Sequence, residues 1–427
     1  MALFHHRKPE QGVELVEPVE RPTLPPGPGG EDGHRSLDEE RDYLLSLVNP
    51  LAPFGMGLVD ASGLAICEDI LAEADVPSGA RAQVDGYALR AGDISNLDES
   101  TQVTLRVRED VDKVGSAVRV RAGDALPAGA DAVVPVERTD LDDDVVTIHG
   151  AVRSGDEVLQ TGAIASRGKR LVHSGQLLDA RLVGLLGVVG IDKVLARPRP
   201  RVVVLSVGED LVEVGHPVGP GQRRDLDSRL LAAAAQGDGA QVWRVACVTS
   251  VEDARTALSD QVIRADLLIS CGGLAGGRHS MVGHAVADLG LSDFADVAMT
   301  PGGTIGFGLV SEEEVPLLML PGESVAAYIG YLAFGEPLVR KLMGVDPRPR
   351  ISRALTQASV PASPDLTRLQ PVRLRLAEEH PVARPIAERR RATLADLVDA
   401  DALAVLPPQE HAVAAGEWVD LWALGNP

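Results

Sequence analysis

Short apolar runs alternate with longer amphipathic stretches between residues 201 and 343, and this alternation predicts a parallel sheet covered by helices. The apolar runs predict strands at 202–205, 242–248, 267–270 and 317–320. The amphipathic stretches predict helices at 227–236, 251–263, 281–289 and 324–343. Together they indicate a doubly wound α/β domain. Loops that follow its strands should meet along one edge of the sheet, where such folds bind ligands.

Two other regions alternate apolar and polar residues with a period of two, which is typical of strands. In the first region, runs separated by turn residues predict strands at 103–107, 117–120, 132–136 and 145–148. In the second, which begins after Pro347 and Pro349, strands are expected at 373–376, 403–406 and 418–422. We therefore expect a β-rich module on each side of the α/β domain.

The remaining patterned stretches predict a few isolated elements. Ser36 is a candidate N-cap, with Glu39 placed to close a capping box, and a helix should run from there to about residue 48. Further elements are expected as a short helix at 60–70, a helix at 177–189 and a strand at 193–196. Residues 1–35 are rich in Pro and Gly, which favours a disordered tail.

Composition narrows the class of protein. The chain has 427 residues, enough for several domains, and a net charge of −21, which disfavours binding to nucleic acid or to anionic membranes. Residues 347–427 carry ten basic and ten acidic side chains, so the excess negative charge lies in the rest of the chain. Three widely spaced cysteines indicate neither a disulfide framework nor a zinc site, and we expect a cytoplasmic protein without membrane insertion.

The loop after the predicted strand 267–270 is rich in glycine, with four at positions 272, 273, 276 and 277. Glycine lets backbone N–H groups approach a ligand closely and adopts positive φ angles. A loop of this kind before a helix N-terminus is suited to binding an anion. A tight strand-to-helix turn without a ligand explains the same residues, and both interpretations stay open here.

Six motifs occur in an order and spacing that resemble the MoeA family, which includes the E domain of gephyrin. They are Val84-Asp-Gly-Tyr-Ala88, Leu126-Pro-Ala-Gly-Ala-Asp-Ala-Val-Val134, Ser206-Val-Gly-Glu-Asp-Leu211, Cys271-Gly-Gly-Leu-Ala-Gly-Gly277, Pro301-Gly302 with Gly306-Phe-Gly308, and Leu320-Pro-Gly-Glu-Ser324. The resemblance implies an elongated homodimer of α/β plus β class, with four subdomains in each chain. These would be subdomain I (36–64 and 165–197), β-rich subdomain II (65–164), MogA-like α/β subdomain III (198–345) and a C-terminal β-barrel, subdomain IV (346–427).

The resemblance also implies a reaction. Enzymes of this family insert molybdenum from molybdate into adenylylated molybdopterin, use a divalent metal such as Mg²⁺, and release AMP. Residues matched to the family motifs suggest Asp85, Asp210 and Asp225 as catalytic groups, although an Asp-Gly turn explains Asp85 better. Glu209 and Asp210 are matched as metal ligands. The matched residues for the molybdopterin nucleotide are Ser206, Gly208, Gly272, Gly273, Gly277, Arg278, Gly302, Pro321 and Gly322.

Several positions depart from the family pattern. The family's Lys-Pro-Gly-Lys-Pro is Thr300-Pro-Gly-Gly-Thr304 here, and Glu323 brings a negative charge to a place where a phosphate would approach. Ala275 and Ser280 replace further polar or acidic groups of the family pattern. Because a hydrogen bond to a charged group contributes about 1.5–3 kcal/mol, loss of two lysines should weaken anion binding by roughly 3–6 kcal/mol. The glycines and prolines that shape these loops are kept, while the lysines and other polar side chains that would bind the ligands are missing.

Two hypotheses follow. The preferred one is a degenerate, gephyrin-like actinobacterial scaffold, a dimer that binds a protein or peptide such as the acidic tail of the cell-division protein FtsZ. Its partner-binding candidates are Arg389, Arg390 and Arg391, which replace a small Gly-Ser-Gly-like stretch of the family. The alternative is a divergent molybdopterin molybdotransferase in which Arg223, Arg224 or Arg278 replaces the lost lysines.

Overall fold

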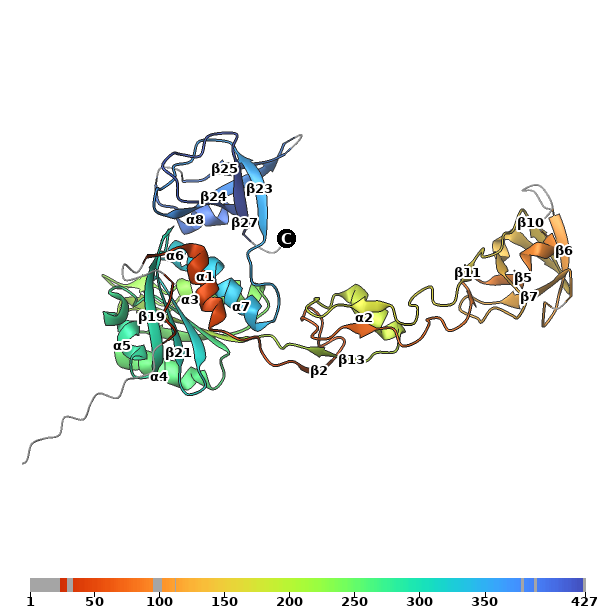
Figure 1. Cartoon of the computed structure of the whole chain (residues 1–427), viewed down its shortest axis with the longest axis horizontal. Helices are drawn as coiled ribbons and strands as arrows, with labels where there is room; N and C mark the ends of the chain where they lie inside the picture. The colour runs from red at the N-terminus through yellow and green to blue at the C-terminus, as the bar shows by residue number, and fades with distance from the viewer. Residues whose placement is uncertain are drawn as a thin grey trace, which may run out of the picture. The chain divides into compact units, whose positions relative to one another are not determined.

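The computed structural model describes residues 24–28, 34–94, 102–111, 113–377, 380–387 and 390–424. The chain forms two compact units (Figure 1). The first comprises Met1–Asn49, Pro200–Leu342 and Asp346–Pro427, and the second Pro50–Arg199 with Met343–Val345. Each unit is described by itself below. Within the described residues, no helix combines the length and the apolar character needed to cross a membrane.

The first unit contains a seven-stranded sheet of order β1-β19-β21-β22-β18-β14-β17. Its strands are β1 (His34–Arg35), β14 (Arg201–Val207), β17 (Gln241–Val248), β18 (Leu267–Cys271), β19 (Gly290–Val297), β21 (Thr304–Val310) and β22 (Val315–Leu320). Neighbours among β17, β14, β18 and β22 are parallel, which confirms the predicted doubly wound core. Strands β19 and β21 were not predicted; they pair antiparallel and extend the sheet beyond β22.

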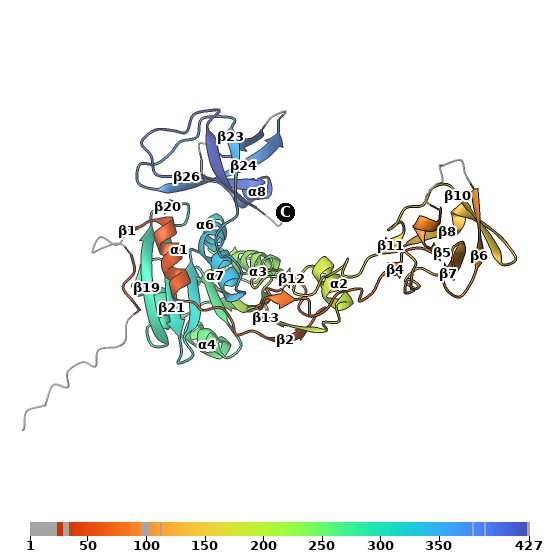
Figure 2. The ribbon, with the colours of Figure 1, turned by 45° about the vertical axis from the view of Figure 1, so that its right-hand side comes forward.

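Helices cover this sheet (Figures 1 and 2). They are α3 (Asp227–Gly237), α4 (Val251–Val262), α5 (Met281–Val286), α6 (Ser324–Gly330) and α7 (Glu336–Leu342), with a π-helical turn at Tyr331–Gly335 between the last two. The helix predicted at 324–343 is therefore interrupted, and the one predicted at 281–289 is shorter. Residues from α4, α5 and the central strands, such as Leu258, Ala285 and Leu268, form one buried apolar core.

The N-terminal helix α1 (Leu37–Ser46) begins as predicted. The Ser36 side chain accepts from the backbone of Glu39, and the Glu39 side chain accepts from the backbone of Ser36, so the capping box is confirmed. However, α1 groups with the first unit rather than with the other residues assigned to subdomain I. The predicted tail is also wrong at its end, because β1 pairs with β19 and Arg35 is buried. Residues 1–23 and 29–33 of that tail lie outside the described residues.

The second unit contains a six-stranded sheet of order β8-β5-β7-β6-β10-β9. Its strands are β5 (Gly86–Leu89), β6 (Gln102–Val107), β7 (Ser116–Val120), β8 (Ala132–Pro135), β9 (Thr139–Asp142) and β10 (Val145–His149). The unit also contains three two-stranded ladders and the helix α2 (Ala180–Val188). The ladders pair β2 (Phe54–Gly57) with β13 (Lys193–Ala196), β3 (Ile70–Leu71) with β12 (Arg170–Val172), and β4 (Arg81–Ala82) with β11 (Val158–Leu159).

The helix predicted at 60–70 is wrong. Its backbone instead bonds to distant segments: Gly63 N–H donates to Leu178 O at 2.8 Å, and Ile66 N–H donates to Gln176 O at 2.9 Å. Gly63 also has a φ of 79°, outside the helical region. Long-range pairing thus overrides the local helical pattern.

The C-terminal module of the first unit is a closed five-stranded barrel. Its strands follow the ring order β24-β25-β23-β27-β26, and β26 pairs back to β24. The strands are β23 (Ile351–Thr356), β24 (Thr367–Leu376), β25 (Pro381–Pro385), β26 (Ala402–Leu406) and β27 (Trp418–Ala423), and the short helix α8 (Leu394–Val398) precedes β26. The short strand β20 (Met299–Thr300), which follows β19, pairs with β24. The α/β plus β class is confirmed, while the four subdomain ranges stay a prediction.

Candidate functional site

The loops after β14, β18 and β22 lie together at one edge of the sheet. The parallel registers place Ser206 beside Cys271 and Cys271 beside Leu320. The backbone N–H of Gly272 donates to Leu320 O at 3.0 Å. The structure thus brings Ser206, Gly272 and the loop at 321–324 to the common edge that the alternating pattern predicts.

The glycine-rich loop packs directly against the end of β14. A side-chain carbon at Gly272 would lie 2.4 Å from Val207 O, and one at Gly273 would lie 2.7 Å from Val207 Cγ1. Both glycines have positive φ, as do Gly276 and Gly277. Close packing of this loop therefore explains Gly272 and Gly273 without a ligand, which favours the tight-turn interpretation.

Ser280 and Glu323 have local roles in the structure. The Ser280 hydroxyl caps α5 by accepting from Gly283 N at 3.0 Å. The Glu323 carboxylate accepts from Val325 N and Ala326 N at 3.1 and 2.9 Å, so it binds the first amides of α6. These amides are the donors that a phosphate would use at this helix end. An internal carboxylate already fills that place.

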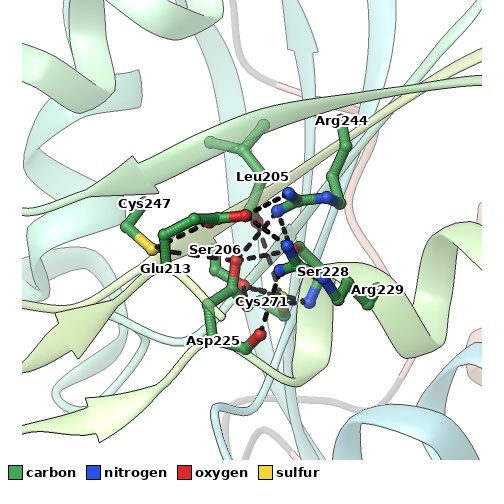
Figure 3. A network of polar contacts seen from close by, with 9 residues as sticks. All are labelled: Leu205, Ser206, Glu213, Asp225, Ser228, Arg229, Arg244, Cys247 and Cys271. Atoms are coloured by element: carbon green, nitrogen blue, oxygen red, sulfur yellow. Dashed lines mark hydrogen bonds and ion pairs between the residues drawn. The ribbon is translucent and has the colours of Figure 1, made fainter. Parts of the chain in front are cut away.

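Asp225 lies in a buried polar network at the carboxyl end of β14 (Figure 3). Its side chain is 0% exposed and accepts from the Ser206 hydroxyl at 2.6 Å and from the Ser228 hydroxyl at 2.5 Å. The backbone N–H of Ser228 donates to it at 3.1 Å, and Arg244 Nη1 donates at 3.2 Å. A carboxylate enclosed by so many donors is suited to holding α3 on the sheet.

The same network extends to Glu213, Arg229 and Arg244 (Figure 3). Glu213 Oε1 accepts from Arg244 Nη2 at 2.6 Å and also contacts Arg229 Nη2. The two guanidinium groups, Arg229 first, lower the pKa of Glu213 from 4.5 to about 2. Burial, followed by the charges of Asp225 and Glu213, raises the pKa of the Cys247 thiol to about 11. Sequence inspection missed this network, since its members are far apart along the chain.

The geometry does not favour a metal ion at either group of acids. One potential ligand from each of Glu213, Asp225 and Cys247 lies within 4.8 Å of the others, but arginines already pair with both carboxylates. Among the described residues, no other group of three His, Cys, Asp or Glu side chains converges in this way. Glu209 and Asp210 are not part of such a group, and Asp210 is paired with Arg223 at 2.8 Å, so their assignment as metal ligands stays a prediction.

Four further candidate residues have few hydrogen-bond partners. Asp85, in the second unit, accepts from Ala122 N at 2.8 Å, which fits the turn interpretation. Arg223 Nη1 reaches Gly322 O at 3.4 Å and so joins two loops of the sheet edge. Arg278 is exposed in the short 3₁₀ turn before α5 and has no hydrogen bond or ion pair to any described residue. Gly208 lies in the loop after β14, where its N–H donates to Val248 O.

A pocket of about 770 Å³ lies between the sheet domain and the barrel within the first unit. Residues 300–304, Pro321 and Glu323 line it from the sheet side, and residues 368–371 and 390–392 line it from the barrel side. The pocket thus brings together the predicted nucleotide residues Gly302 and Pro321 and the predicted partner residues Arg390 and Arg391. Its volume is in the range typical of ligand sites.

The arginines that line this pocket differ in how many of their donors are already bonded to other side chains. Arg390 makes a double hydrogen bond to Asp396 at 2.6 and 2.7 Å and holds the pKa of that carboxyl well below its usual range. Arg391 is exposed, and its guanidinium makes no hydrogen bond or ion pair to any described residue. Arg368 donates twice to Gln370 Oε1, and burial lowers its pKa. Arg389 lies outside the described residues.

Arg368 and Gln370 were not predicted as site residues. They belong to β24, which reaches the pocket because Thr300 of β20 pairs with Arg368. Nothing in their local pattern distinguishes them from other barrel residues. Only the pairing of two strands far apart in the sequence reveals them.

A doubly wound α/β domain joined to a closed five-stranded barrel, with a β-rich second unit, defines a MoeA-like class of protein. Three family profiles match the chain in order: the MoeA N-terminal region (domain I and II) at residues 35–190, a probable molybdopterin binding domain at 203–341, and the MoeA C-terminal region (domain IV) at 353–424. The chain belongs to the MoeA family.

Curated relatives agree with this family, and a solved structure shares the fold. Molybdopterin molybdenumtransferase 2 of Mycobacterium tuberculosis is 32% identical over 91% of this chain and 100% of its own length. Molybdopterin molybdenumtransferase 1 of the same organism is 30% identical over 91% of this chain and 98% of its own length. A molybdopterin biosynthesis MoeA protein from Pyrococcus horikoshii has the same fold, with a TM-score of 0.73, 24% identity, and coverage of 91% of this chain and 98% of the other.

Proposed function

We propose that the chain is a divergent molybdopterin molybdotransferase that binds adenylylated molybdopterin in the pocket between the sheet domain and the barrel. The observation that carries this proposal is the meeting of residues 300–304 and Pro321 with Arg368 and Arg391 around one cavity. The activity named for the two mycobacterial relatives supports the same function. Molybdate and the nucleotide are substrates in this proposal, and AMP is the released product.

The arginines of the barrel compensate for the missing lysines in this proposal. We expected Arg223, Arg224 or Arg278 to take that role, but none of them lines the pocket. Arg391 instead offers an unpaired guanidinium among the described residues. Since one charged hydrogen bond contributes about 1.5–3 kcal/mol, Arg368 and Arg391 together restore roughly what two lysines would contribute.

The test is binding and turnover of the nucleotide. We expect adenylylated molybdopterin to bind the purified protein, and molybdate to trigger release of AMP. Arg391→Ala should weaken nucleotide binding by about 10–100-fold, equivalent to one charged hydrogen bond. Arg264→Ala, which changes an exposed arginine outside the pocket, is the matched control and should have no effect. Absence of both nucleotide binding and AMP release would exclude this function.

A second candidate is a gephyrin-like dimeric scaffold with a degenerate molybdopterin site. The specific observation in its favour is Glu323, whose carboxylate binds the α6 amides and opposes a phosphate. In this proposal the pocket binds an acidic peptide, for example the tail of FtsZ in an actinobacterial cytoplasm. Titration of the same protein with division-protein tail peptides separates the two proposals. A bound peptide without nucleotide binding supports the scaffold, and no peptide binding excludes it.

A further inference from the structure

The pocket combines an apolar wall with three arginines, of which Arg391 is exposed and unpaired among the described residues. Its apolar members are Pro301, Pro321, Val325, Ala326, Ile329, Leu369, Pro371, Ala387 and Ala392. Arg368, Arg390 and Arg391 provide the cations, and Glu323 is the one acidic group among the lining residues that the structure describes. Such a surface suits a segment that alternates apolar and acidic side chains.

The chain itself carries such a segment near its N-terminus. Residues 9–20 contain four acidic side chains and no basic ones. The acids are Glu10, Glu14, Glu17 and Glu20, and they alternate with the apolar residues Val13, Leu15, Val16 and Val19. These residues lie outside the described part of the structure.

The described residues that follow this segment are anchored close to the pocket. Tyr43 Oη donates to Pro25 O at 2.8 Å, and a side-chain carbon at Gly27 would lie 2.3 Å from Arg35 Nη2. Residues 24–28 therefore pack over the buried Arg35, whose guanidinium pairs with Glu40 at 2.8 Å and Asp293 at 2.7 Å.

From Arg35 the path to the pocket is short. Arg35 O accepts from Ala298 N at 2.7 Å, and Ala298 precedes the pocket residue Thr300 by two positions. Two residues span at most about 8 Å, whereas the fourteen positions from Leu24 back to Glu10 span up to about 50 Å. The acidic segment is thus long enough to enter the pocket of its own chain.

We propose that residues 10–20 dock in this pocket as an internal ligand that any other anionic ligand must displace. The four glutamates of this segment are opposite in charge to the barrel arginines, and its valines and Leu15 match the apolar character of the wall. Because a tethered ligand has an effective concentration in the millimolar range, even weak docking would lower the affinity for an outside ligand by about tenfold. This regulation rests on the pocket being the ligand site of the proposed function, but its test involves no nucleotide.

The probe is a fluorescein-labelled peptide of residues 9–22, titrated into the full-length protein and followed by fluorescence anisotropy. A full-length variant with all four glutamates changed to Gln (E10Q, E14Q, E17Q and E20Q) has a tail of equal length that cannot compete. We expect this variant to bind the peptide about tenfold or more tightly than the wild-type chain. Adding Arg391→Glu to the variant should abolish binding, while the control Arg264→Glu should leave it unchanged.

Equal affinity of the two full-length proteins, or binding insensitive to Arg391→Glu, would overturn the proposal. A difference that appears only at high protein concentration would assign the tail to the pocket of a second copy and would also overturn docking within one chain. In a further outcome, the four-glutamine variant binds the peptide more tightly than wild type and loses this binding with Arg391→Glu, while neither protein binds the nucleotide. That result would support the internal ligand and refute only the transferase activity.

Discussion

At the scale of single residues, the Glu213 carboxylate is the clearest charge-dependent contributor to stability. Its pKa falls from 4.5 to about 2 on folding because Arg229 and Arg244 pair with it. A folded state with the lower pKa binds fewer protons, so the stabilisation is fully present above about pH 4.5 and is lost as the pH falls toward 2. Glu213→Gln should therefore destabilise the protein at pH 7 by about 1–2 kcal/mol.

The measurement is urea denaturation of wild type and Glu213→Gln between pH 7 and pH 3. The difference between the two proteins should shrink as the pH falls below about 4.5, since the wild type loses its advantage there. Glu410→Gln, at an exposed site without a side-chain partner among the described residues, is the control and should change stability by less than about 0.5 kcal/mol. A difference that stays constant with pH would disprove the role of the arginine pair.

Single residues were also where sequence inspection was least reliable. Ser280 counted as a lost polar group, yet it is 3% exposed and caps α5. Asp225 was matched as catalytic, but its partners Ser206, Ser228 and Arg244 come from three other elements. Residue types near a motif indicate which chemistry is available. Which group a side chain bonds to depends on the tertiary structure.

At the scale of elements, the glycine-rich loop provides a matched pair of substitutions. Gly272 and Gly276 both have positive φ, but only at Gly272 would a side-chain carbon collide with a neighbouring backbone atom, Val207 O, at 2.4 Å. Gly276→Ala should cost about 1–2 kcal/mol for its φ alone. Gly272→Ala should cost at least about 2 kcal/mol more, because β14 and the loop must move apart. Thermal or urea denaturation measures both, and equal costs would refute the packing explanation.

Elements with a clear period were predicted well, and those defined by pairing were not. The parallel strands and helices of the α/β domain follow from their apolar runs, as strand β18 shows with five consecutive buried residues. Strand β21 was missed because Gly306 and Gly308 interrupt its pattern. A side-chain carbon at Gly306 would lie 2.9 Å from the Phe294 ring, so the neighbouring strand requires these glycines.

At the scale of the whole molecule, the pocket shows what composition and motifs cannot reveal. Its wall is assembled from the segment after β19, the start of α6, strand β24 and the loop after β25. The motifs at 301–302 and 320–324 indicated half of this wall. The half of the wall that the barrel contributes, with Arg368 and Arg391, depends on how the closed barrel packs against the sheet domain. That packing cannot be predicted from a local sequence pattern.

The net charge of −21 should slow the approach of an anion to the pocket. It repels an approaching anion over long distances, whereas Arg368 and Arg391 attract it only within the pocket. Salt screens the long-range repulsion first, since the Debye length is about 10 Å at 0.1 M. We therefore expect the association rate of the labelled acidic peptide with the four-glutamine variant to rise several-fold between low and physiological salt. Stopped-flow anisotropy measures this rate. A fall with salt would mean that the pocket cations dominate the field around the protein.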